Sequence, residues 1–184
     1  MIVDESNFEQ VVSAYYASLY RFAFSLARRE ADACDLTQET FRRLAEKGHQ
    51  VRDPSKIKTW LFTTLYREFV DGWQKQSRCI HVDPDAVDHE LPPEAPALAD
   101  RIDGAAARNE LLEIEEPYRA PLVLFYLEDH SYREIAEILS IPAGTVMSRI
   151  SRGRDLLRQR MEDKPVRVNG HAVANKRFKT QVVP

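Results

Sequence analysis

Residues 131–154 read Ser-Tyr-Arg-Glu-Ile-Ala-Glu-Ile-Leu-Ser-Ile-Pro-Ala-Gly-Thr-Val-Met-Ser-Arg-Ile-Ser-Arg-Gly-Arg, and this stretch constrains the fold more than any other. Ser131 and Glu134 have the spacing of a capping box, in which each side chain binds a backbone amide left free at a helix start. Apolar residues then follow at helical spacing, until Ser140-Ile-Pro-Ala-Gly144 interrupts the pattern and starts another helix. The stretch therefore predicts a helix-turn-helix.

The second of these helices is predicted to be apolar on one side and basic on the other. Its apolar positions repeat every three, four or seven residues: Val146, Ile150, Leu157 and Met161. Arginines occupy the remaining surface almost unopposed, Asp155 being the exception: Arg149, Arg152, Arg154, Arg158 and Arg160. Small residues at the helix start would let it enter a DNA major groove, with Arg149 and Arg152 facing bases or phosphates. A solvated surface helix is the alternative, and the tight turn favours DNA binding over it.

Composition excludes several classes of protein. The 184 residues, 43% hydrophobic and 30% charged, suffice for one medium domain or two small ones. The net charge of -3 argues against a uniformly basic nucleic-acid coat, so any DNA contact must come from local patches. Cys34 and Cys79 lack the paired spacing of a zinc site or a disulfide framework. Neither an apolar run of membrane-spanning length nor a signal-peptide pattern is present, and we expect a cytoplasmic protein without membrane insertion.

Three helices are predicted before residue 79. Apolar residues from Phe8 to Leu26 form one stripe, which indicates a helix of about five turns. A second helix is expected over residues 31–44, ending near Lys47-Gly48, where the glycine would supply a left-handed cap. After a break at Asp53-Pro54, a third helix is expected over residues 57–78.

The second helix carries an acidic face. Asp32, Asp35 and Glu39 lie three and four residues apart, which places their carboxylates on one side of the helix. A metal site or an acid/base pair would need a histidine or a second carboxylate helix, and the sequence offers neither nearby. A solvated face and a docking surface for a basic partner both remain, because periodicity alone does not separate them.

The third helix has more aromatic residues than one buried stripe needs. Its stripe consists of Ile57, Leu61, Leu65 and Phe69, and the additional rings are those of Trp60, Phe62, Tyr66 and Trp73. Rings interleaved with cations suit a single-stranded nucleic-acid surface, because bases stack on rings while cations hold phosphates. Core packing is the alternative for about half of the rings. We expect Trp60 and Leu61 to be buried.

A proline-rich, acidic stretch from Cys79 to Asp100 divides the chain. It contains no lysine or arginine, and it is either a solvated tether or a strap for a positively charged groove of a partner. Helical periodicity resumes near Ile102, with helices expected over residues 105–114 and 117–127. The basic tail from residue 164 shows little periodicity, and we expect it to be disordered.

These motifs resemble the extracytoplasmic-function (ECF) group of bacterial sigma factors. The resemblance is carried by Asp35-Leu-Thr-Gln-Glu-Thr-Phe41, Trp60-Leu-Phe62, Tyr118-Arg-Ala-Pro-Leu-Val-Leu-Phe-Tyr126, Ser131-Tyr-Arg-Glu-Ile-Ala136 and Pro142-Ala-Gly-Thr-Val-Met-Ser-Arg149. It covers residues 7–163 in the family's order. It implies an all-α fold of two small helical domains, sigma region 2 over residues 1–78 and sigma region 4 over residues 104–163, with an acidic linker over 79–103 and a basic tail over 164–184.

The resemblance also implies a promoter-specificity subunit with no catalytic residues, metal or cofactor. Its partners would be core RNA polymerase, through the largest and second-largest subunits, promoter DNA and an anti-sigma factor. The residues implied to dock on polymerase are Asp32, Asp35, Gln38, Glu39 and Phe41. Those implied to bind the -10 element are Tyr66, Arg67, Asp71, Trp73, Lys75 and Arg78. Those implied to bind the -35 element are Arg133, Gly144, Thr145, Ser148, Arg149 and Arg152.

Two residues depart from the family's usual pattern. Arg67 stands where asparagine is usual, near the pocket for an extruded -10 base, which leaves the base preference there open. Ser140 stands where a turn glycine is common. A free-standing helix-turn-helix regulator is the rival interpretation, and it would bind a two-fold symmetric operator tightly without polymerase. An enzyme that uses the acidic face is a further alternative, which no catalytic constellation supports.

Overall fold

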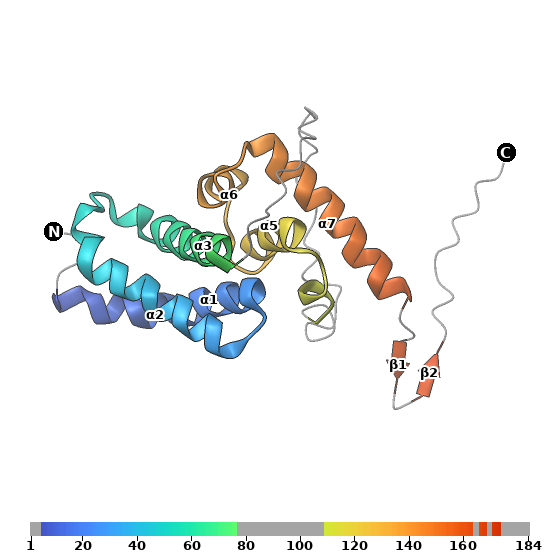
Figure 1. Ribbon diagram of the computed structural model, residues 1–184. Coiled ribbons are helices and arrows are strands. Elements are labelled where there is room, and N and C mark those ends of the chain that lie inside the picture. Colours follow the sequence, from blue (N-terminus) through green and yellow to red (C-terminus); the bar gives the residue numbers. More distant parts are fainter. Residues whose placement is uncertain (1–4, 77–108, 164–165, 169–170, 174–184) are drawn as a thin grey trace.

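The computed structural model describes residues 5–76, 109–163, 166–168 and 171–173 (Figure 1). Helices make up nearly all of the described structure, which confirms the predicted all-α class. They are α1 (Glu5–Ala27), α2 (Glu30–Lys47), α3 (Ile57–Gln76), α5 (Glu116–Tyr126), α6 (Tyr132–Leu139) and α7 (Ala143–Asp163), with short 3-10 turns at Gly48–Gln50 and Pro54–Lys56. Among the described helices, none is both long and apolar enough to cross a membrane.

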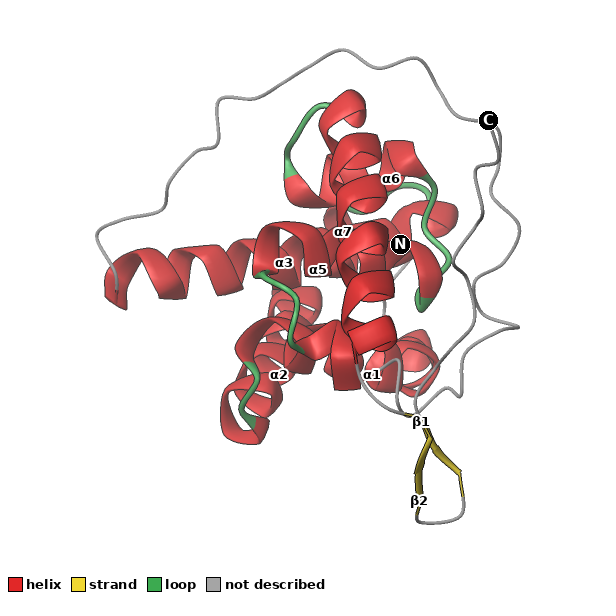
Figure 2. Cartoon of the chain, turned by 90° about the vertical axis from the view of Figure 1, so that its right-hand side faces the viewer, coloured by secondary structure: helices red, strands yellow, loops and turns green. Residues whose placement is uncertain are grey.

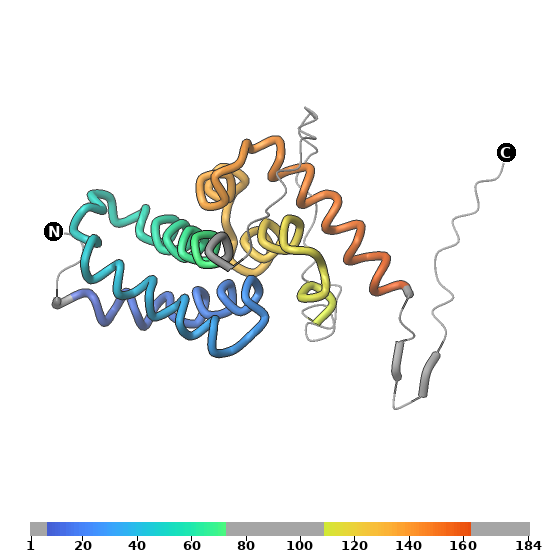
Figure 3. The backbone as a smooth tube through the Cα atoms, viewed as in Figure 1, coloured from blue at the N-terminus to red at the C-terminus, as the bar shows by residue number. Residues whose placement is uncertain are grey.

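Helices α1, α2 and α3 form the N-terminal helical unit around one aromatic and aliphatic core (Figure 3, blue to green). Phe22 of α1 and Phe62 of α3 are fully buried, with ring centroids 5.4 Å apart. Leu61 is fully buried as expected, whereas Trp60 is only partly buried. One residue corresponds to about 100° around a helix, so Trp60 lies at the edge of the face that Leu61 presents to the core.

The end of α2 differs from the expectation. Gly48 was predicted to be left-handed, but its φ of -60° and ψ of -24° are right-handed, and its N–H bonds to the Leu44 carbonyl. The backbone needs no reversal there, because α2 continues directly into the 3-10 turn at Gly48–Gln50. Asp53 then begins the next 3-10 turn by accepting hydrogen bonds from the backbone N–H and hydroxyl of Ser55, at 2.9 and 2.8 Å.

Helices α5, α6 and α7 form the C-terminal helical unit (Figure 3, yellow to red). The capping box is confirmed, since Ser131 accepts from the Glu134 N–H at 3.3 Å and its own N–H donates to the Glu134 carboxylate at 2.9 Å. Ser140, which stands where the resemblance implies a turn glycine, ends α6 in the left-handed region with φ 54°. Helix α7 then crosses α5 closely, because a Cβ added at Gly153 would lie only 2.8 Å from Leu122 Cδ1.

The two helical units pack against each other: α3 lies beside α6, and α1 lies beside α5 (Figures 1 and 2). The interface contains the ion pair of Arg21 with Glu128, a bond from Lys58 to the Glu128 carbonyl, and an edge-to-face contact of Phe62 with His130. The contact therefore joins segments far apart in the sequence.

The tail contains regular structure that the sequence analysis did not expect. Strand β1 (Val166–Val168) pairs antiparallel with β2 (His171–Val173), with Val166 opposite Val173. The sequence between the strands is Asn169-Gly170, and Asn-Gly between short apolar-alternating segments is a strong hairpin signal. The predicted linker at residues 79–103 lies outside the described residues.

Candidate polymerase and nucleic-acid interfaces

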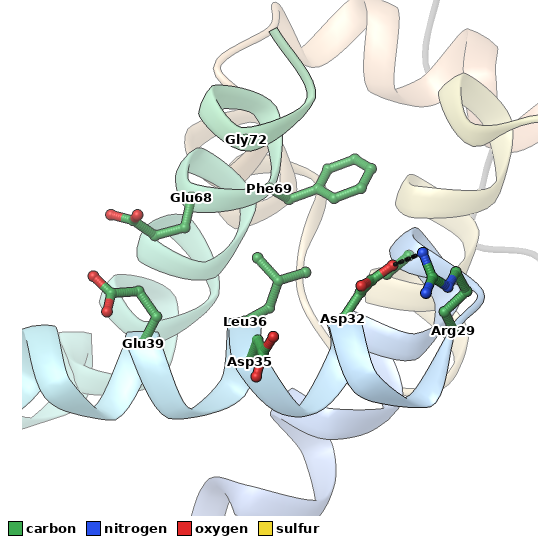
Figure 4. A pocket seen from close by; sticks show the side chains of 9 residues that line it. Arg29, Asp32, Asp35, Leu36, Glu39, Glu68, Phe69 and Gly72 are labelled. Carbon is green, nitrogen blue, oxygen red and sulfur yellow. Dashed lines mark ion pairs between the residues drawn. The ribbon is translucent and has the colours of Figure 1, made fainter. Parts of the chain in front are cut away.

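The acidic face of α2 borders a pocket of about 320 Å³ between α2 and α3 (Figure 4). Three predicted docking residues, Asp32, Asp35 and Glu39, are brought together on the α2 side. Its full lining is Ala27, Arg29, Asp32, Asp35, Leu36, Glu39, Glu68, Phe69 and Gly72. Carboxylates and apolar side chains thus share one concave surface, which suits a partner side chain with an apolar stem and a cationic end.

The carboxylates around this pocket differ in how far they are already paired. Glu39 accepts hydrogen bonds from Arg42 at 2.6 Å and Arg43 at 2.9 Å, and these bonds, that from Arg42 first, lower the Glu39 pKa to about 2. Asp32 lies 3.5 Å from Arg29. Asp35 is exposed and makes no ion pair within the described part of the chain. It is therefore the carboxylate most available to a basic partner.

The other two predicted docking residues are placed differently. Gln38 is exposed one turn after Asp35. Phe41 is only 8% exposed and its ring stacks on that of Tyr16, with centroids 6.2 Å apart. Phe41 therefore packs against α1, and only a small part of its ring is open to a partner.

Helix α3 presents part of the predicted -10 set. Arg67 and Asp71 are exposed. Tyr66 is largely buried and its hydroxyl donates to the Glu116 carboxylate at 3.2 Å; burial, with that carboxylate adding to it, raises the Tyr66 pKa. Trp73 and Lys75 belong to α3 by their backbone, and Arg78 lies outside the described residues.

The predicted -35 residues surround the start of α7. Arg133 of α6 and Arg152 are exposed, while Ser148 is half-buried and donates a hydrogen bond to the Thr145 carbonyl at 3.0 Å. Nothing within 4 Å would meet a Cβ at Gly144, so the first turn of α7 has an open approach. Arg149 is half-buried.

Glu116, the first residue of α5, is a site residue that the sequence analysis missed. Burial raises its pKa, while the Tyr66 hydrogen bond and the positive charges of Arg119 and Arg149 oppose that rise. The predicted -10 residue Tyr66 thus bonds to this carboxylate, and the charge of the predicted -35 residue Arg149 acts on it without an ion pair between them in the described structure. The Tyr66–Glu116 bond depends on how α3 approaches α5, and no local sequence pattern signals it.

More of the arginines of α7 are paired with carboxylates than the sequence predicted. Arg160 pairs with the buried Glu110 at 3.2 Å, and Arg158 approaches Asp155 at 3.4 Å. The Nε of Arg154 is buried without a hydrogen-bond partner in the described structure. Of the two predicted -35 arginines on this helix, Arg152 is exposed and Arg149 is half-buried.

Within the described ranges, no group of three or more histidine, cysteine or acidic side chains is placed to hold a metal ion. The arrangement instead combines a concave acidic surface on the N-terminal unit with a basic, accessible helix on the C-terminal unit. Such surfaces bind macromolecules through charge complementarity.

Both helical units match families of known proteins. The sequence profile of Sigma-70 region 2 matches residues 11–79, and that of Sigma-70 region 4 matches residues 105–157. The ECF RNA polymerase sigma factor SigW of Bacillus subtilis is 28% identical over 171 residues, which span 87% of this chain and 91% of SigW. The ECF sigma factor SigE of Mycolicibacterium smegmatis is 33% identical over 156 residues, spanning 83% of this chain and 60% of SigE.

A solved structure is similar over the same extent. The sigma factor RpoE of Bartonella quintana, crystallised with the anti-sigma factor NepR, superimposes with a TM-score of 0.66 and 29% identity, over 85% of this chain and 98% of RpoE. Both halves of the chain, in the same order, therefore match one kind of protein. The chain belongs to the extracytoplasmic-function subfamily of the sigma-70 RNA polymerase sigma factors.

Proposed function

We propose that this sigma factor docks on core RNA polymerase through the α2 side of the pocket and directs it to promoters by reading the -10 element with α3 and the -35 element with α7. The observation that carries the proposal is the exposed, unpaired Asp35 at the rim of a concave surface with an apolar interior. A carboxylate that is buried or already paired within the chain would form a weaker ion pair with a partner, because its existing contacts would have to be broken first.

Separate roles for the two units follow from their surfaces. The N-terminal region 2 domain, residues 1–78, would contact the largest polymerase subunit and stabilise the opened -10 strand. Arg67 and Asp71 are available for this on α3. The region 4 domain, residues 104–163, would contact the second-largest subunit. Arg149 and Arg152, just after the accessible first turn of α7, would bind the -35 element. The acidic linker over 79–103 would join them.

Catalysis in this proposal belongs entirely to polymerase, and the chain contributes specificity. When both DNA-binding helices are held on one polymerase, the two promoter elements are bound in one bimolecular encounter and not in two. Neither unit therefore needs to bind its own element tightly in isolation. An anti-sigma factor would hold the chain idle in the cytoplasm. The relative from Bartonella quintana, solved with such an inhibitor, supports that part by similarity.

Run-off transcription with purified core polymerase over a promoter library tests the proposal. We expect the chain to direct initiation from a defined subset of promoters, and Asp35→Arg to abolish both polymerase binding and transcription, because a cation replaces the unpaired carboxylate. Glu9→Arg, on an exposed position of α1, is the matched control and should bind normally. Tight operator binding by a chain that ignores polymerase would instead favour the free-standing regulator.

A further inference from the structure

An arginine joins the two walls of the pocket between α2 and α3. Arg43 of α2 donates from Nε to the carboxylate of Glu39 at 2.9 Å, and its Nη2 lies 3.1 Å from the carboxylate of Glu68 on α3. Both glutamates line the pocket, and Figure 4 shows them at the same end of it. Two carboxylates held this way on neighbouring helices would repel each other if no cation lay between them. Arg43 therefore neutralises this end of the pocket.

The two glutamates depend on Arg43 to different degrees. Glu39 also accepts hydrogen bonds from Arg42 at both of its carboxylate oxygens, at 2.6 and 2.5 Å. It would thus stay paired if the charge of Arg43 were removed. For Glu68, Arg43 is the only ion-pair partner in the part of the chain that the structure describes. Removing the charge of Arg43 would therefore release Glu68 and leave Glu39 paired.

The rest of the pocket offers one unpaired carboxylate above an apolar surface. At the end opposite the glutamates, Asp32 lies 3.5 Å from Arg29 (Figure 4). Asp35, between the two ends, is exposed and makes no ion pair with any described residue. Leu36 and Phe69 are the larger apolar side chains of the lining. Four carboxylates thus border the pocket, but arginines of the chain itself already pair with all except that of Asp35.

A surface of this kind fits one cationic side chain. A lysine or arginine of a partner can lay its apolar stem along Leu36 and Phe69 while its charged end reaches Asp35. A second cation could reach Glu68 only by displacing Arg43, and the loss of that pair would offset most of the gain from the new one. The pocket is therefore complementary to a protein surface that presents a single lysine or arginine, and less so to a cluster of them.

Resting on the polymerase-docking role of Asp35 under the proposed function, we infer that Arg43 is a specificity-determining residue of the docking surface. It pairs with Glu68 and so makes Asp35 the one carboxylate that is available to polymerase, which contributes one lysine or arginine side chain to the pocket. Arg43 acts through Glu68 and is a positioning residue.

The dependence of polymerase binding on Asp35, measured in two backgrounds, tests this role. Purified core RNA polymerase is titrated into the fluorescently labelled full chain, and affinities are compared with and without Asp35→Asn. In the wild-type background, loss of this charge should lower the affinity by roughly tenfold or more. In the Arg43→Met background, the released Glu68 supplies a second carboxylate, so Asp35→Asn should lower the affinity by only about threefold. A purely structural role of Arg43 would leave the effect of Asp35→Asn the same in both backgrounds.

Further variants identify Glu68 as the substitute. Adding Glu68→Gln to Arg43→Met removes the released carboxylate, and the roughly tenfold effect of Asp35→Asn should return. Arg43→Lys keeps the positive charge, so Asp35→Asn should have the same effect there as in the wild type. Arg52→Met makes the matched charge change at an exposed position of the same unit and should not alter the effect of Asp35→Asn. Arg43→Gln takes the place of Arg43→Met if circular dichroism shows that the methionine variant has lost its helices.

Two results would overturn the inference: an equal effect of Asp35→Asn in the wild type and in Arg43→Met, or a reduced effect that Glu68→Gln does not restore. Failure of the proposed function is seen separately, because the wild-type chain would then not bind core polymerase, or would bind it equally well with Asp35→Asn. The inference concerns the difference between backgrounds, so the two failures remain distinguishable.

Discussion

Replacing Gly153 with alanine tests how closely α5 and α7 approach each other. The added Cβ would lie 2.8 Å from Leu122 Cδ1, and 3.2 Å from both Leu122 Cγ and Tyr118 Cβ. Leu122 is 1% exposed, and Tyr118 Cβ is fixed to the backbone, so neither neighbour can move freely. Overpacking of this kind costs about 1–3 kcal/mol.

A second glycine separates this steric cost from helix propensity. Alanine is about 0.8–1.0 kcal/mol better than glycine inside a helix, and this gain applies to both Gly153 in α7 and Gly72 in α3. A Cβ at Gly72 would meet nothing within 4 Å. Gly72→Ala should therefore raise the free energy of unfolding by about 1 kcal/mol. Gly153→Ala makes the same gain in helix propensity but also has the steric clash, so its free energy of unfolding should be about 1–3 kcal/mol lower than that of Gly72→Ala.

Urea denaturation followed by helical circular dichroism measures both variants, with the midpoint and slope giving the free energy of unfolding. A double variant sharpens the assay: in a Leu122→Ala background the nearest neighbour is gone, so Gly153→Ala should become much less unfavourable. The reasoning is refuted if Gly153→Ala stabilises the wild-type background as much as Gly72→Ala does.

Two further predictions concern the C-terminal unit. Burial lowers the His130 pKa from 6.5 to about 4, with Lys58 adding to the shift, so the unfolded chain takes up this proton at a higher pH than the folded one. Above about pH 6.5 His130 should not affect the free energy of unfolding, which should then decrease as the pH falls toward 4. In a plot of urea midpoint against pH, His130→Phe should reduce this decrease. An equal decrease in the variant and the wild type would contradict the assignment. Ser131→Ala removes the cap of α6 and should lower the free energy of unfolding by about 1 kcal/mol in the same assay. Ser13→Ala, at an exposed position of α1, is the control and should lower it by less than about 0.5 kcal/mol. Equal losses in the two variants would show that the capping box contributes nothing.

Local patterns predicted much of the helical structure correctly. The capping box of Ser131 and Glu134, the turn that follows α6 and the acidic face of α2 all depend on residues that are near one another in the sequence, at most seven positions apart in the acidic face. The hairpin between β1 and β2 depends on equally local signals, and an Asn-Gly dipeptide indicated it. Each strand has only three residues, too few to show a clear periodicity, and the tail was therefore expected to be disordered.

Burial along α2 was harder to predict. Phe41 was assigned to the docking face together with Asp35, yet it is buried against Tyr16. An aromatic residue next to an acidic face is compatible with either position, and only the packing of α1 on α2 decides between them.

Helix positions, the helix-turn-helix and the division of charge between the two halves follow from the amino-acid order, because the interactions behind them act between near neighbours. The tertiary structure alone brings Glu116 to Tyr66, joins Arg21 to Glu128 across 107 positions, and places Gly153 against Leu122. These contacts depend on how whole helices cross, which is set by the summed packing of many side chains. No short pattern encodes that sum.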